Sequence, residues 1–163
     1  MEALARSRRR TAVFCFVVAC SAVVVASTAS AAALPNPCTL LIKVHPEKTL
    51  AGGKSVAVTH GKLTKSGSDS LASSTCSEMV GKLSVFLTLS PSAGGFGGIN
   101  VISTTHPSGL GSGDELVVGT SPSGKPVDFI VFHRSSVYAD ISANGAKPGN
   151  LTLLARQVYK LLH

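Results

Sequence analysis

The sequence predicts a small α+β domain in which an antiparallel β-sheet packs against a C-terminal α-helix. Between positions 55 and 142, short segments of alternating apolar and polar residues are separated by turns rich in Gly, Ser and Pro. This pattern is typical of antiparallel strands. The chain ends instead with apolar residues at helical spacing after Asn150. Two cysteines, Cys38 and Cys76, predict one disulfide that braces the domain.

Residues 1–33 are predicted to be a signal peptide. Met1–Arg10 is basic, with four arginines against one glutamate, and Thr11–Ala26 is apolar and uncharged. Ala29–Ala31 then supplies the small side chains that a signal peptidase requires at the first and third positions before its cut. The apolar run is shorter than the roughly 18–20 residues that cross a bilayer, and no stop-transfer charges follow it. The mature protein should therefore be a single domain, residues 34–163.

A second interpretation of this segment remains open. Val17–Cys20 fits the bacterial lipobox, in which the cysteine receives a lipid and becomes the new N-terminus. The apolar character of Ser21–Ala33 argues against it, because lipoprotein tethers are usually polar and flexible. We expect a secreted, extracellular protein. The alternative is a lipid anchor on Cys20 at the outer face of the cell membrane, and this anchor is the one membrane attachment that we consider.

The remaining cysteines follow from this export prediction. Cys15 and Cys20 would leave with the signal peptide, which isolates Cys38 and Cys76 in an oxidising compartment. The alternatives are a zinc site and a catalytic thiol. A zinc site usually has a second ligand close in sequence to each cysteine, and neither Cys38 nor Cys76 has one. We therefore predict a Cys38–Cys76 disulfide, no metal and no cofactor.

The first elements of the mature chain are predicted to be helical. Asn36 can cap a helix, and Pro37 suits its first turn, where a missing N–H costs nothing. A helix over Cys38–Val44 should follow, ended by Pro46. A further helical turn can form over Pro46–Ala51.

Strands are predicted next, and the clearest alternation lies in residues 83–89, where four apolar residues share one face. The other predicted strands are 55–63, 99–104, 116–118, 127–133 and 137–142, of which the last two form a hairpin. Residues 65–74 are rich in Ser, Gly and Asp and are predicted to be a surface loop.

The last element is predicted to be a helix capped by Asn150. Leu154, Val158 and Leu161 lie on one stripe, whereas Arg156 lies off it. This stripe needs an apolar partner, and the apolar face of the sheet is the obvious one.

Composition argues against several function classes. The formal net charge is +7, of which three units belong to the predicted signal peptide. The remaining basic residues are dispersed and form no cluster with aromatics, so we expect no nucleic-acid binding. The five histidines are scattered, and no Gly-x-Ser-x-Gly sequence marks a nucleophile. We therefore assign no catalytic residue and expect that the protein is not an enzyme.

Four short motifs give a family resemblance. They are Asn36–Leu41, the second cysteine Cys76, the segment Gly111–Glu115 and the terminal Leu154–Val158. Together they resemble a group of small actinobacterial envelope domains, secreted or lipid-anchored, whose function is unknown. The resemblance spans nearly all of the mature chain. It implies a disulfide-braced α+β domain without known catalytic residues.

The function predicted from these observations is a non-enzymatic binding or sensing module of the cell envelope. Its partner, an envelope ligand or protein, is not identified by the sequence. One alternative is a carrier that holds an apolar ligand, such as a lipid, between helix and sheet. A small secreted hydrolase is the less favoured alternative.

Overall fold

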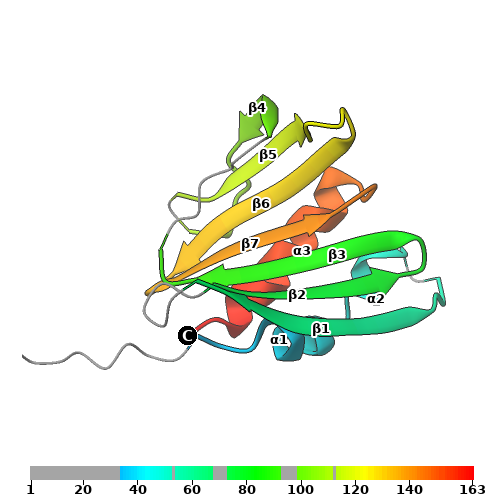
Figure 1. Cartoon of the computed structure of the whole chain (residues 1–163), viewed down its shortest axis with the longest axis horizontal. Helices are drawn as coiled ribbons and strands as arrows, with labels where there is room; N and C mark the ends of the chain where they lie inside the picture. Colours follow the sequence, from blue (N-terminus) through cyan, green and yellow to red (C-terminus); the bar gives the residue numbers. More distant parts are fainter. Residues whose placement is uncertain (1–33, 53, 68–72, 93–98, 112) are drawn as a thin grey trace, which may run out of the picture. The chain divides into compact units, whose positions relative to one another are not determined.

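The computed structural model describes residues 34–163 except positions 53, 68–72, 93–98 and 112 (Figure 1). The predicted signal peptide and the lipobox cysteine, Cys20, lie outside the described residues. The described part of the chain forms a seven-stranded antiparallel sheet and three helices, with one disulfide. The predicted α+β class, with a C-terminal helix against an antiparallel sheet, is confirmed at this level.

Two short helices come first, seven consecutive strands follow, and a longer helix ends the chain. In chain order they are α1 (Pro37–Val44), α2 (Pro46–Leu50), β1 (Val58–Ser66), β2 (Ser73–Val80), β3 (Leu83–Ser90), β4 (Asn100–Thr105), β5 (Glu115–Thr120), β6 (Pro126–Arg134), β7 (Val137–Ala143) and α3 (Pro148–Leu161). The strand order is β1-β2-β3-β7-β6-β5-β4, so the C-terminal strand β7 lies at the centre.

The N-terminal helices form as the sequence predicts. The Asn36 side chain accepts hydrogen bonds from the backbone N–H groups of Cys38, at 2.9 Å, and Thr39, at 3.4 Å, which satisfies two free donors of α1. His45 ends α1 and precedes α2 in a left-handed conformation, with φ of 50°. This conformation is uncommon for a residue with a side chain and turns the chain sharply between the two helices.

Strand β2 was not predicted, and the expected loop over residues 65–74 is partly wrong. Lys65 and Ser66 belong to β1, and Ser73 and Ser74 begin β2. The strand carries Ser, Thr and Glu where a typical strand has branched apolar residues, so its sequence lacks a hydrophobic alternation. Pairing with β3 stabilises it instead, including a 3.0 Å hydrogen bond between the Thr75 and Thr88 hydroxyls.

Helix α3 packs against β6 and β7, as its apolar stripe predicts. It begins at Pro148 after Lys147, so Asn150 lies within the first turn and is not the predicted cap. Leu151, Leu154, Ala155 and Val158 are buried against the sheet. At its C-terminal end, Arg134 donates a 2.7 Å hydrogen bond to the Tyr159 carbonyl.

All three helices lie on one side of the sheet (Figure 1). The core between helices and sheet holds alternate residues of the central strands, among them Val85, Leu87 and Leu89 of β3 and Ala139, Ile141 and Ala143 of β7. We call this side the helix-covered face. The alternating residues of the same strands point to the other side, which we call the open face.

Candidate functional site

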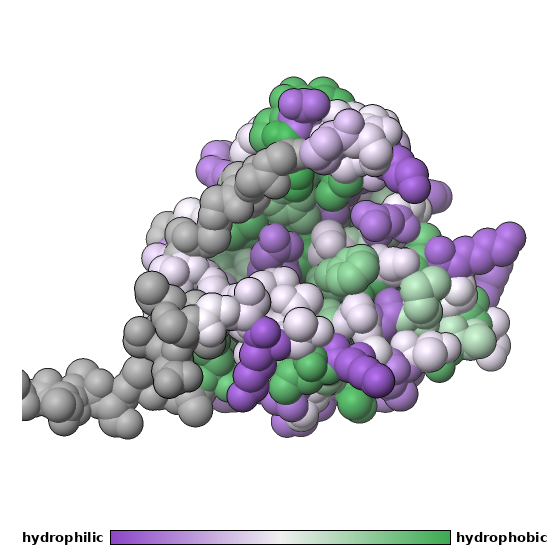
Figure 2. All heavy atoms as spheres, in the orientation of Figure 1, coloured by the Kyte–Doolittle hydropathy of each residue, from purple (hydrophilic) through white to green (hydrophobic). Residues whose placement is uncertain are grey.

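The open face carries a mixture of hydroxyl, aromatic and carboxylate side chains. Strand register places on it Thr75, Ser77 and Met79 of β2, Ser84, Phe86 and Thr88 of β3, Tyr138, Asp140 and Ser142 of β7, Phe129, Val131 and His133 of β6, and Glu115 and Val117 of β5. Figure 2 shows this face, with pale side chains of intermediate hydropathy beside green apolar ones and a hollow between the upper and lower strands. Such a concave, mixed surface has the composition of a ligand site.

Asp140 lies at the centre of the open face. Its neighbours in register are Thr88 on β3 and Val131 on β6. Burial raises the pKa of its carboxyl from the ordinary value of 3.8 to about 6. Within the described part of the chain, no side chain or backbone group forms a hydrogen bond or ion pair with it. A partly buried carboxylate in this state costs stability, and a donor on a bound ligand would offset that cost.

An apolar pocket opens on the part of the open face formed by β1, β2 and β3. Its volume is about 160 Å³, and it is lined by Phe86, Met79, Ser77, Ser84, Thr59, His60, Gly61 and Glu78. The Phe86 and Met79 side chains stay 37% and 42% exposed, although most large apolar side chains of the sheet are buried. Exposed apolar side chains beside hydroxyl groups can contact both the apolar and the polar parts of one ligand.

The opposite part of the open face holds rings and buried apolar side chains. His133 and Tyr138 pair across β6 and β7 with ring centroids 5.4 Å apart and planes inclined by 26°. Val117 and Phe129 are 1% and 2% exposed, although the helices cover the other side of the sheet. The open face is therefore not a flat solvated surface but is itself partly sheltered.

A second candidate site lies between the α1–α2 turn and the edge of the sheet. The His60 Nδ1 atom lies 2.9 Å from Glu78 Oε1, and the Glu78 side chain is 1% exposed whereas that of His60 is 60% exposed. A pocket of about 160 Å³ opens above this pair. Its lining is Ile42, His45, Pro46, Glu47, Val58, His60 and Glu78. We call it the His60 pocket.

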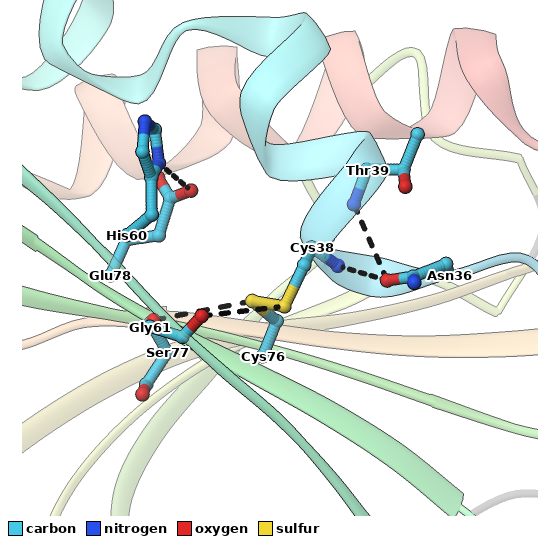
Figure 3. The surroundings of a disulfide bond; sticks show 8 residues. All are labelled: Asn36, Cys38, Thr39, His60, Gly61, Cys76, Ser77 and Glu78. Atoms are coloured by element: carbon cyan, nitrogen blue, oxygen red, sulfur yellow. Dashed lines mark hydrogen bonds and ion pairs between the residues drawn. A yellow bond between two sulfur atoms is a disulfide. The ribbon is translucent and has the colours of Figure 1, made fainter.

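A β-bulge turns His60 toward this pocket. The register between β1 and β2 shifts between His60 and Leu63, and such a shift re-aims the side chains around it. Gly61 is required there, because a Cβ atom on it would lie 1.5 Å from the Ser77 carbonyl oxygen. In Figure 3 the second nitrogen of the His60 ring points away from the Glu78 carboxylate.

The predicted disulfide is confirmed and lies next to the same pair. Cys38 in α1 and Cys76 in β2 are bonded, with Cα atoms 5.1 Å apart (Figure 3). The bond fastens the first turn of α1 to the strand that carries Glu78. It therefore fixes the two walls of the His60 pocket relative to each other.

Sequence reasoning missed Asp140, His60 and Glu78 as site residues. Glu78 and His60 are 18 residues apart and meet only through the β1–β2 register. The alternation of β7 did place Asp140 opposite the apolar face, which was the one available signal. Across the described ranges, no three His, Cys, Asp or Glu side chains come together as they would around a metal ion.

No protein-family model, curated protein or solved structure matches this chain. The resemblance to actinobacterial envelope domains therefore stays a prediction. Among the helices of the described residues, none has the length and apolarity to cross a bilayer.

Proposed function

We propose that this protein is a non-enzymatic binding module, secreted or held at the bacterial cell envelope, whose ligand binds on the open face. The ligand carries an apolar group together with a hydrogen-bond donor. The observation that carries this proposal is Asp140, a partly buried carboxylate without a partner in the described chain, at the centre of that face.

The argument for a ligand rests on the cost of such a group. A protein gains stability by pairing or fully exposing its carboxylates, whereas Asp140 has no partner in the described chain and is only partly exposed. Groups that lower the stability of the folded state and form no stabilising contact in it are characteristic of binding and catalytic sites. A ligand N–H or O–H at Asp140 would supply the missing partner.

The neighbouring pocket accounts for the apolar part of the ligand. Phe86 and Met79 present exposed apolar surface within one pocket of about 160 Å³. In register terms, Phe86 and Asp140 are diagonal neighbours on β3 and β7. Such neighbours are about 7–8 Å apart, so one small ligand can contact both.

Affinity capture with matched variants tests this proposal. The purified protein is immobilised and exposed to an envelope extract of the producing organism, and retained lipids, glycans and proteins are identified by mass spectrometry. We expect a retained species that is lost from Asp140→Asn and from Phe86→Ala. Asp128→Asn is the control, because Asp128 lies on β6 in the register that faces the helices.

Two results would contradict the proposal. Equal retention by wild-type protein and both open-face variants would place the ligand elsewhere. A retained species that Asp128→Asn also loses would indicate a general effect of charge. Turnover of an ester or peptide panel, abolished by a single substitution, would instead favour the hydrolase.

The apolar-ligand carrier is the second candidate, supported by the exposed Phe86 and Met79. A lipid held between α3 and the sheet has less support, because Leu154 and Val158 are already fully buried against the strands. The disulfide is consistent with the proposed location, since disulfides persist in oxidising compartments. Membership of the actinobacterial envelope group is part of the same proposal.

A further inference from the structure

The His60 pocket shares His60 and Glu78 with the pocket on the open face, but the rest of its lining comes from α1, α2, the turn between them and Val58 of β1, which gives it a chemistry of its own. Its polar lining consists of two histidine–glutamate pairs. His60 Nδ1 lies 2.9 Å from Glu78 Oε1, and His45 Nδ1 lies 3.2 Å from Glu47 Oε1. The remaining lining side chains, Ile42, Pro46 and Val58, are apolar.

When the two imidazoles are neutral and their Nδ1–H groups donate to the carboxylates, the remaining polar atoms of these pairs accept hydrogen bonds and none donates. A carboxylate only accepts. In a neutral imidazole, an Nδ1–H that donates to the carboxylate leaves Nε2 as an acceptor. His60 is 60% exposed and His45 is 53% exposed, so both rings can be reached from solvent. A ligand that complements this lining must bring the donors.

The charge of the pocket points the same way. Glu78 is buried, and its Oε2 atom has no hydrogen-bond partner in the described chain. No Lys or Arg of the described residues lies within ion-pair distance of Glu47 or Glu78. The field of a buried carboxylate is poorly screened, so the pocket above it is electronegative although the chain as a whole is basic.

We propose that the His60 pocket binds a primary ammonium group on a short hydrocarbon chain. The ammonium contacts the His60 Nε2 atom and the Glu47 carboxylate, while Glu78 is a positioning residue that holds the His60 ring. The hydrocarbon part contacts the apolar walls. A volume of about 160 Å³ is similar to the roughly 150 Å³ of a cavity that holds benzene, which leaves room for such a chain. A metal ion fits less well, because no three ligands converge in the described residues.

Two sources share this chemistry, a free alkylamine and a lysine side chain of another protein. Titrations at pH 8 with n-butylammonium and with a lysine residue blocked at both its amino and carboxyl ends distinguish them. Binding is followed by NMR through the His60 ring and the His45 ring, because His45 lines the His60 pocket and not the pocket on the open face. Butan-1-ol, of the same length but without charge, is the control ligand. Saturation by both amines indicates a lysine site, and saturation by n-butylammonium alone indicates a free amine.

Three variants of the protein test the assignment of contacts. Glu47→Gln removes a charge and His60→Phe removes the ring nitrogens, so each should weaken ammonium binding at least about tenfold. Glu115→Gln, on the distant strand β5, should leave it unchanged. Because Glu47 and His60 are solvent-accessible, both variants should fold, which their amide spectra will verify.

The proposal is overturned by any of four results, three of which concern the amine titrations. These three are the absence of saturable shifts with either amine, equal shifts with butan-1-ol, or unchanged affinity in both pocket variants. Tight binding of Zn²⁺ that excludes n-butylammonium would also overturn it in favour of a metal site. None of these results bears on Asp140, so they leave the proposed function of the open face intact.

Discussion

The two faces of the sheet are built on different principles, although they share the same strands. On the helix-covered face, Leu87 and Ile141 pair across β3 and β7, and both are fully buried. On the open face, the next pair along the same strands joins Thr88 to Asp140, a carboxylate whose pKa is raised by burial. The Leu87–Ile141 pair adds to stability through apolar burial, whereas the Asp140 carboxylate reduces it. The difference locates the residues that stability alone does not explain.

The largest expected effect on stability comes from the disulfide that joins α1 to the sheet on the helix-covered face. Replacing Cys38 and Cys76 together by alanine removes the bond between α1 and β2. The two residues are 38 apart in sequence, so the chain-entropy model predicts a loss of roughly 4 kcal/mol in the free energy of unfolding. Urea titration of the double variant measures it. Non-reducing peptide mapping that finds two free thiols in freshly isolated protein would contradict the disulfide itself.

The second prediction concerns the packing of α3 on the sheet. Leu154→Ala should lower the free energy of unfolding by about 2–5 kcal/mol, because Leu154 is fully buried and the substitution leaves a cavity. Denaturant titration gives the value.

Arg156→Ala is the control for this substitution. Arg156 lies off the apolar stripe, and its guanidinium donates hydrogen bonds to the Ser108 carbonyl, at 2.8 Å, and hydroxyl, at 3.0 Å. Exposed hydrogen bonds of this kind contribute about 1 kcal/mol or less. Equal losses for Leu154→Ala and Arg156→Ala would show that α3 does not dock through its apolar stripe.

The sequence predicted the helix-covered face well because that face depends on hydrophobic periodicity. The stripe of α3, the alternation of β3 and the β6–β7 hairpin all appear in the apolar pattern. The cap formed by Asn36 could also be predicted, because it depends only on residues close together in the chain. The start of α3 was misplaced, because Pro148 already satisfies the first turn and Asn150 therefore falls inside the helix.

The candidate sites could not be predicted because they depend on register between distant segments. Strand β2 has no apolar alternation that marks it as a strand, so the pairing that brings Glu78 to His60 was invisible. The environment of Asp140 depends likewise on which strands flank β7. The strand order puts β3 and β6 on its two sides, and nothing in the local sequence determines that order.

The third prediction tests the contrast between the two faces of the sheet through the ionisation of Asp140. Its folded pKa of about 6 lies above the ordinary 3.8, so between these values the folded state holds a proton that the unfolded state releases. The contribution of Asp140 to stability is therefore fully present below about pH 4 and is lost as the pH rises through about 6. Asp140→Asn removes the charge and should stabilise the protein by up to about 3 kcal/mol at pH 7, and by much less at pH 4.

Urea titrations of Asp140→Asn and wild-type protein at pH 4, 5, 6 and 7 measure this effect. Asp128→Asn is the matched control on the other register of β6, where we expect no such rise in stability. If the stability difference between Asp140→Asn and wild-type protein does not vary with pH, burial does not raise the pKa of the Asp140 carboxyl. The functional role assigned to it would then lose its main support.

The smallest expected effect on stability is that of Phe86→Ala, and it separates stability from binding. Phe86 is 37% exposed and stands between Ser77 on β2 and Ser142 on β7, whose small side chains leave its ring partly free. We expect a loss of about 1 kcal/mol in the free energy of unfolding, below the cost of removing a fully buried ring, because less apolar surface leaves the protein interior.

Its neighbour on the same strand, Leu87, is fully buried on the helix-covered face, so Leu87→Ala should cost about 2–5 kcal/mol. Urea titrations should therefore show the larger loss of stability for Leu87→Ala. Envelope capture should show the larger loss of ligand for Phe86→Ala. If Phe86→Ala destabilises as strongly as Leu87→Ala, the open face is a second core and not a binding surface.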